Sequence, residues 1–199
     1  MRVIGTVGLP GSGKGEAAAV AREEGLPVVT MGDVIRQACR DRGLDPAEHH
    51  GRVAQALREE DGPAAIAARS IPQVRDALAD HDAVLVDGLR SDVELDRFRE
   101  AFGDDFLLVS VEAPFELRAE RLLERARDDT DLDREALRER EQRELGFGMG
   151  EAMERADVRI DNTGSLEDFQ GSVRTLLSGG AAAARDRENV TVAEGTGDP

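Results

Sequence analysis

A short segment near the N-terminus combines glycines and a lysine in the spacing of a phosphate-binding loop. The segment "GLPGSGKG", residues 8–15, matches the first seven positions of G-x-x-x-x-G-K-[ST] and has glycine at the eighth. The glycines let the backbone curl until successive N–H groups point at one phosphate. The segment therefore predicts an ATP-binding set of residues: Gly8, Leu9, Pro10, Gly11, Ser12, Gly13, Lys14 and Gly15.

Lys14 is the only lysine among the 26 basic residues of the chain, and all the others are arginine. A compact ammonium suits the β- and γ-phosphates of a nucleotide, whereas a wide planar guanidinium would fill the loop differently. We therefore predict that Lys14 is catalytic. A guanine-reading Asn-Lys-x-Asp motif would need a second lysine, so ATP is expected rather than GTP.

Magnesium is expected beside these phosphates, although Gly15 lacks the hydroxyl that Ser or Thr would offer the ion. Asp87 follows the apolar segment "AVLV" and is the predicted metal ligand and a predicted catalytic residue. The alternative is that Asp87 is a turn residue before Gly88. We interpret Glu16 as a first-turn acid that interacts with the helix dipole, while a contact with metal-bound water stays open.

The elements that must position these residues follow a βα pattern. Apolar segments at residues 2–8, 26–31, 82–88, 106–113 and 156–162 predict five strands, and amphipathic segments between them predict helices. This alternation predicts an α/β fold, a three-layer sandwich in which a five-stranded parallel sheet carries helices on both faces. We expect one domain over residues 1–178, with a helical insert at about 32–79. Residues 179–199 are poor in large apolar residues and predict a disordered tail.

The composition limits the partners that the chain can have. It holds 42 acidic against 26 basic residues, a formal charge of -16, which argues against binding nucleic acid or an anionic membrane. An arginine-rich acidic chain favours a halophilic cytoplasm at molar salt, where the Debye length is about 3 Å. A GC-rich genome is the alternative explanation. No apolar run near 18 residues and no signal-peptide pattern is present, so a cytoplasmic location is expected.

With these segments located, the chain resembles P-loop nucleotide kinases, especially adenylate kinases. The segments "TMGDVIR", residues 30–36, and "VDGLR", residues 86–90, are similar to that family's acceptor-binding segments. The resemblance implies an acceptor-binding set of Gly32, Asp33, Arg36 and Arg90. The segment "APFELRAERLLER", residues 113–125, is similar to the helix that precedes the family's lid. It implies that Arg121 stacks on the adenine and that Arg125 is a catalytic residue on the donor phosphates.

The large lid of adenylate kinases is missing, and a short lid-like segment at about 125–147 leaves Arg127 and Arg138 as candidates. A short lid followed by "ADVRIDNTGSLED" is also similar to dephospho-coenzyme A kinases. That likeness implies that Asn162 borders the donor adenine. To about residue 178, the chain most resembles an uncharacterised archaeal family of small kinase-like ATP-binding proteins.

Together these observations predict an ATP- and Mg²⁺-dependent kinase whose partner is a small-molecule phosphate acceptor such as a nucleoside monophosphate. A dephospho-coenzyme A-type kinase is the alternative in the same class. An ATP-binding switch that hydrolyses slowly and a catalytically inactive nucleotide-binding module are alternatives from other classes. Any single arginine can instead be a surface residue that pairs with an acid along its helix.

Overall fold

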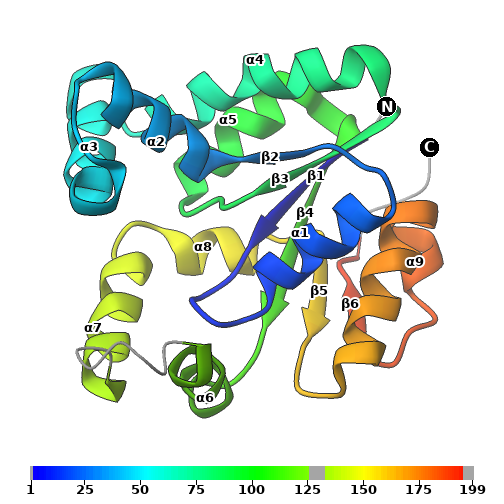
Figure 1. The fold of residues 1–199 in the computed structure, drawn as a ribbon. Coiled ribbons are helices and arrows are strands. Elements are labelled where there is room, and N and C mark those ends of the chain that lie inside the picture. The colour runs from blue at the N-terminus through cyan, green and yellow to red at the C-terminus, as the bar shows by residue number, and fades with distance from the viewer. Residues whose placement is uncertain (1, 126–132, 195–199) are drawn as a thin grey trace.

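The computed structural model of the chain describes residues 2–125 and 133–194, built around one twisted sheet (Figure 1). The strand order is β2-β3-β1-β4-β5-β6. The strands are β1 (Arg2–Val7), β2 (Val28–Thr30), β3 (Ala83–Asp87), β4 (Phe106–Glu112), β5 (Val158–Asp161) and β6 (Val190–Val192). The first five are parallel, and β6 pairs antiparallel to β5. The α/β sandwich predicted from the sequence is confirmed, with one strand more than expected.

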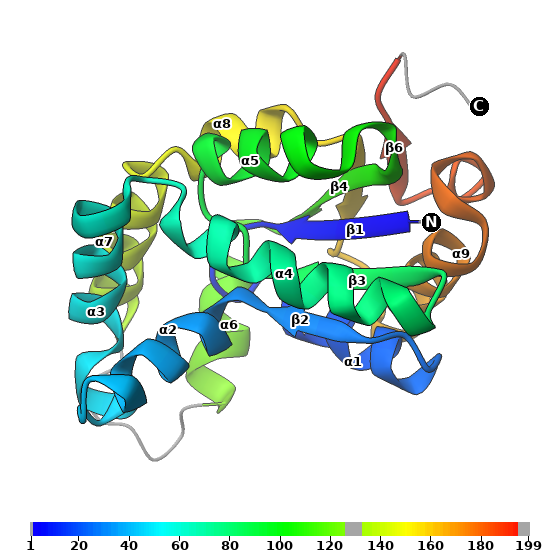
Figure 2. The same ribbon diagram turned by 90° about the horizontal axis from the view of Figure 1, so that it is seen from above.

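Helices cover both faces of the sheet and extend beyond its carboxyl edge (Figure 2). One face carries α1 (Lys14–Glu23) and α9 (Leu166–Ala184), and the other carries α4 (Ala65–Asp80), α5 (Asp92–Phe102) and α8 (Met149–Glu154). The remaining helices are α2 (Met31–Asp41), α3 (Pro46–Asp61), α6 (Phe115–Arg125) and α7 (Arg134–Leu145). Within the described residues, no helix is long and apolar enough to cross a membrane.

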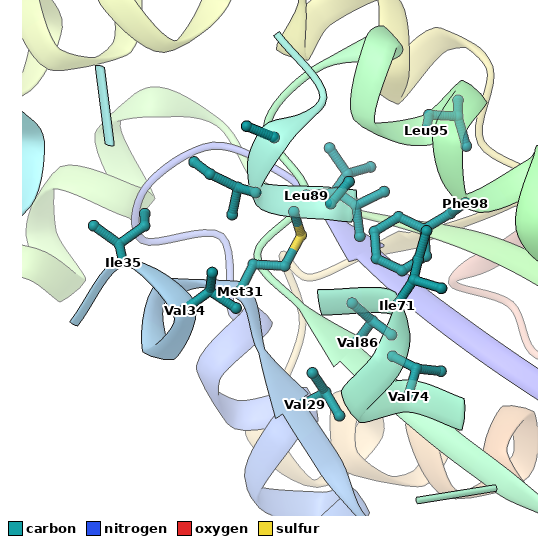
Figure 3. Close-up of a cluster of buried hydrophobic side chains, with 14 of the residues drawn as sticks. Val29, Met31, Val34, Ile35, Ile71, Val74, Val86, Leu89, Leu95 and Phe98 are labelled. Carbon is teal, nitrogen blue, oxygen red and sulfur yellow. The ribbon is translucent and has the colours of Figure 1, made fainter. Parts of the chain in front are cut away.

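The core follows from the period-two pattern of the strands. Val84 and Val86 of β3 pack under α4 and α5, whereas Leu85 between them packs under α1 and α9. Figure 3 shows how the first of these clusters gathers Met31, Leu89 and Phe98 around the strand side chains. Burial of both faces holds the strands in register, so the residues that follow β1 and β3 emerge at the same edge of the sheet.

The chain changes direction across the sheet at β1, which lies between β3 and β4. The connection after β1 leads toward β2 on one side, and the later connection from β3 to β4 crosses to the other side. Ligands of open α/β sheets bind outside the carboxyl ends of the strands at such a switch point. The fold thus places the loop of residues 8–13 at the position where a ligand is expected.

The helical insert predicted at about 32–79 is found as α2, α3 and α4, and α4 continues through Pro72. The short lid-like segment contains α7 in its described part, and residues 126–132 lie outside the described residues.

The disordered tail predicted for residues 179–199 is wrong for residues 179–192. The backbone of α9 is kinked at Gly180, where φ is 71°, and a further helical segment reaches Ala184, while β6 extends the sheet beyond β5. Ala184 is fully buried and Val190 is nearly so, which shows that small side chains are enough to anchor this segment. Asn189 fixes it further, because its Oδ1 accepts a hydrogen bond from Ser172 Oγ at 2.6 Å. Residues 195–199 lie outside the described part of the chain.

Candidate functional site

The loop between β1 and α1 has the backbone of a phosphate cradle. Gly11 and Gly13 have φ values of 81° and 119°, which side chains other than glycine rarely adopt. A Cβ at Gly11 would lie 2.6 Å from the Arg118 carbonyl oxygen, and one at Gly13 would lie 2.3 Å from Asn162 Nδ2. Gly13 is also the N-cap of α1, so the loop leads directly into free helical N–H groups.

Lys14 lies at the centre of this loop. Its ammonium donates hydrogen bonds to the carbonyl oxygens of Gly8 and Leu9. Burial lowers the pKa of Lys14 to about 8, and the nearby carboxylates of Asp87 and Glu144 oppose that shift. A partly desolvated cation at the first turn of α1, beside the free N–H groups of that helix, is a strong site for a phosphate.

Asp87 lies next to this lysine because β3 pairs with β1 and places Asp87 opposite Thr6. Asp87 Oδ1 accepts a hydrogen bond from Thr6 Oγ1 at 3.1 Å, which orients the carboxylate at the strand end. In the part of the chain that the structure describes, no group of three or more His, Cys, Asp or Glu side chains could hold a metal ion. One carboxylate with phosphate oxygens and water is, however, a usual ligand set for Mg²⁺, so Asp87 fits the ion.

Glu16, the other candidate acid, is directed elsewhere. Its Oε1 accepts a hydrogen bond at 2.6 Å from Gln170 Nε2 on α9. This contact fits the interpretation of Glu16 as a first-turn acid of α1 better than a role in holding the metal.

A cavity of about 330 Å³ joins the loop to the ends of β2 and β3. It brings together most of the residues predicted for the phosphates and the acceptor, namely residues 10–15, Gly32, Arg36, Asp87 and Arg90. Asp33 lies beside the lining, and its Oδ1 accepts hydrogen bonds from Arg36 at 2.7 and 2.8 Å. The donor and acceptor segments predicted separately therefore border one space.

Sequence reasoning missed five polar residues that line this cavity: His50, Arg58, Glu94, Arg140 and Glu144. Glu94 is fully buried. Its carboxylate accepts hydrogen bonds from Arg58 Nη2 at 3.2 Å and from the Arg90 backbone N–H at 2.8 Å, and the second bond fixes the loop after β3. Burial raises the pKa of Glu94, and burial together with nearby arginines lowers that of His50. The Ser91-x-x-Glu94 spacing signals a capping box, so sequence alone indicates a helix start rather than a buried acid.

Helix α7 contributes a carboxylate and a guanidinium to the cavity. Glu144 Oε1 accepts hydrogen bonds from Arg90 Nη1 and from Arg140 Nε, each at 3.1 Å. Arg138, the lid candidate on the same helix, instead lies with its guanidinium 4.7 Å from the Phe115 ring centre and pairs with Glu116. Arg125 ends α6, and its side chain lies outside the described part of the chain, as does all of Arg127.

The remaining predicted residues, Arg121 and Asn162, lie on the other flank of the loop. They line a second hollow of about 270 Å³ together with Gly13, Glu16 and the exposed side chain of Leu166. Arg121 Nη2 donates to the Asn162 carbonyl oxygen at 2.9 Å, and Asn162 Nδ2 donates to the Ser12 carbonyl oxygen at 2.7 Å. Asn162 thus ties the end of β5 to the phosphate loop.

A larger hollow of about 1090 Å³ lies outside the ends of β4 and β5, beside residues 186–191. It includes Leu9 and Asn162 but neither Lys14 nor Asp87. We place the candidate site in the cavity of about 330 Å³, because Lys14 and Asp87, the cation and the acid that phosphate chemistry requires, line that cavity.

Comparison with known proteins places the chain among archaeal relatives. A family model described as an AAA domain matches residues 7–138. A UPF0200 protein of Halobacterium salinarum is 64% identical over 178 residues, which cover 89% of this chain and 93% of that protein. The chain belongs to the UPF0200 family. A further UPF0200 protein from Methanosarcina barkeri is 45% identical over 89% of this chain and 95% of its own length.

Solved structures similar to this UPF0200 chain share its fold at low sequence identity. A gluconokinase from Sinorhizobium meliloti has a TM-score of 0.56 at 21% identity and covers 94% of each chain. A shikimate kinase from Acinetobacter baumannii in complex with shikimate has a TM-score of 0.54 at 20% identity, over 89% of this chain and 93% of that one. The chain therefore shares its fold with these two kinases.

Proposed function

We propose that this UPF0200 protein is an ATP-dependent small-molecule kinase that transfers the γ-phosphoryl group to a phosphate-bearing acceptor such as a nucleoside monophosphate. One observation carries the proposal. A single cavity is lined by Lys14 and Asp87 and also by Arg36 and Arg90. A site that only binds a nucleotide needs the first pair and has no use for the second.

On the donor side, residues 8–15 hold the β- and γ-phosphates of ATP, and Lys14 compensates their charge. Arg121 and Leu166 border the hollow beside Asn162, which suits an adenine between a guanidinium face and an aliphatic side chain. Asp87 holds Mg²⁺, which neutralises charge on the phosphate oxygens when it is bound. The resemblance to kinases adds Arg125 to the proposed donor-phosphate residues, although its side chain lies outside the described part of the chain.

On the acceptor side, Arg36 and Arg90 bind the anionic group of the acceptor, and Gly32 gives it room near α2. Guanidinium groups suit this task because their planar fork pairs with two phosphate oxygens at once. Phosphoryl transfer asks the protein mainly to align two substrates, neutralise charge and exclude water. The cavity meets these demands with fixed positive charges and with walls from α2, α3 and α7.

The proposal is tested by incubating the protein with ATP, Mg²⁺ and a panel of nucleoside monophosphates and dephospho-coenzyme A, and by measuring ADP. We expect ADP formation that depends on one acceptor and is abolished in Lys14→Ala. ADP formation indifferent to every acceptor would favour a slow ATPase switch, and the absence of nucleotide binding would contradict both.

The acceptor assignment is tested by Arg36→Ala, with Arg40→Ala as a matched control on the same helix. Arg40 is exposed and bonded to Gln37, outside the cavity lining. We expect Arg36→Ala to raise the KM for the acceptor about tenfold or more and to leave the KM for ATP within about twofold. An equal loss for both substrates would contradict the assignment.

A further inference from the structure

The acceptor cavity already contains an anion supplied by the protein. The Glu144 carboxylate lies between Arg90 and Arg140, both of which donate to its Oε1 at 3.1 Å. Its negative charge also opposes the lowering of the Lys14 pKa by burial. The Glu144 side chain is only 10% exposed, whereas those of Arg90 and Arg140 are 43% and 47% exposed. An incoming anion can therefore reach these guanidinium groups.

The pairing with Arg140 has the i,i+4 spacing of an ordinary helix-surface ion pair. The pairing with Arg90 does not, since Arg90 follows β3 and is 54 residues away in the sequence. Two guanidinium groups from separate elements thus converge on one oxygen inside the cavity that residues 10–15 of the predicted phosphate-binding loop line. This arrangement is the one that would otherwise bind a substrate oxyanion.

Helix α7 is held mainly by charge. In α7, Leu137 and Glu144 are the buried residues. The helix is tied to the rest of the chain by the ion pair of Glu141 with Arg118 at 2.7 Å and by pairs of Arg134 and Arg138 with Glu116. Such a helix can shift when an anion replaces Glu144, because little apolar contact area has to be given up.

We propose that Glu144 makes this subsite select an acceptor with a phosphate over an acceptor with a carboxylate. The inference rests on the proposed function, which assigns Arg90 to the acceptor, and it adds Arg140 to the residues that bind the acceptor. A free carboxylate would make the same bonds that Glu144 already makes. It would also have to compete with the Glu144 carboxylate, which is tethered to the site and has an effective concentration in the millimolar range. A phosphate dianion carries more charge and three acceptor oxygens, so it gains bonds to both arginines and displaces Glu144.

The test measures anion binding directly, with inorganic phosphate and acetate as probes in calorimetric titrations at fixed ionic strength. In the unaltered protein we expect a phosphate site that is lost in Arg140→Gln, and no acetate binding.

Glu144→Gln keeps the shape of the side chain and removes its charge. We expect it to bind phosphate at least tenfold more tightly and to bind acetate measurably. Phosphate held by the loop around Lys14 survives in Arg140→Gln, which separates the two sites.

Glu139→Gln is the matched control, because Glu139 is an exposed acid on the same helix that pairs with Arg143. It should leave both titrations unchanged. Glu144→Asp, which retains the charge, should continue to exclude acetate even if Glu144→Gln lowers the melting temperature. Unchanged or weaker phosphate binding in Glu144→Gln would overturn the proposal, and so would acetate binding to the unaltered protein. These titrations need no turnover, so a failure of the proposed kinase activity would appear separately, as an absence of ADP.

Discussion

At the residue scale, the burial of the Lys14 ammonium explains both its lowered pKa and its expected affinity for phosphate. Lys14 is the only lysine in the chain, and burial lowers its pKa from 10.5 to about 8. Burial of the charged ammonium costs free energy in the free protein. A bound phosphate offsets this cost, because an anion stabilises the ammonium. The same desolvation that makes the cation costly therefore makes it a strong phosphate ligand.

This pKa predicts a pH dependence of nucleotide binding. Above pH 8 the free protein loses the Lys14 proton, so the affinity for ATP should fall by up to about tenfold per pH unit, with uptake of one proton on binding. Unfolding does not explain this fall in ATP affinity. Between pH 8 and 10.5 the folded state binds fewer protons at Lys14 than the unfolded chain does, so the contribution of Lys14 to the free energy of unfolding rises with pH. Calorimetry from pH 7 to 9.5 in buffers of different ionisation enthalpy measures both effects. An affinity that stays constant over this range would contradict the assignment.

Sequence reasoning located Lys14 and Asp87 because a rare residue and a strand-end acid stand out from their surroundings. It did not find Arg140 or Glu144. In a chain with 34% charged residues, a pair at i,i+4 on an exposed helix looks like any other surface pair. Only the folded chain brings Glu144 on α7 to Arg90 in the loop after β3, and that contact has no signature in the local sequence.

At the scale of elements, Asn162 couples the last parallel strand to the phosphate loop. Its side-chain Nδ2 donates to the Ser12 carbonyl oxygen at 2.7 Å across 150 positions of sequence, and both residues are buried. The resemblance to kinases implied that Asn162 borders the donor adenine. In the structure its amide also supports the backbone of the phosphate loop, so we expect Asn162 to affect ATP binding through the loop as well.

Asn162→Ala should therefore lower the free energy of unfolding by about 1–2 kcal/mol, because it leaves a buried carbonyl without its donor. It should also weaken ATP binding, since the loop loses its support. Asn189→Ala is the control, because Asn189 ties β6 to α9 and β5 without touching the loop. We expect it to lower the melting temperature and to leave ATP affinity unchanged. Equal effects of the two changes on ATP affinity would contradict this role of Asn162.

The first four strands were predictable because each is a largely apolar segment, as buried parallel strands require, and β5 because buried Val158 and Ile160 alternate with exposed residues. Strand β6 was not, since "VTV" is short and its surroundings are alanine, glycine and charged residues. It forms because β5 would otherwise be an edge strand, and pairing with β6 satisfies backbone groups that the local sequence does not reveal.

At the scale of the whole molecule, the charge of -16 predicts a stability that depends on salt. Raising KCl from 0.1 to 1 M shortens the Debye length from about 10 to about 3 Å and screens the mutual repulsion of surface acids. We expect the melting temperature to rise over this range, as measured by differential scanning calorimetry. Choline chloride at equal ionic strength should have a similar effect, and a melting temperature that falls or stays constant in both salts would contradict a halophilic adaptation.

The central claim is that this cavity aligns two phosphate-bearing substrates and transfers the γ-phosphoryl group between them. A single-turnover reaction with ATP labelled in the γ-phosphate, Mg²⁺ and the panel of acceptors follows that group to its destination. The account predicts that the label appears on an acceptor and that Lys14→Ala leaves it on ATP. Label found only in inorganic phosphate, at a rate that no acceptor changes, would contradict the kinase assignment.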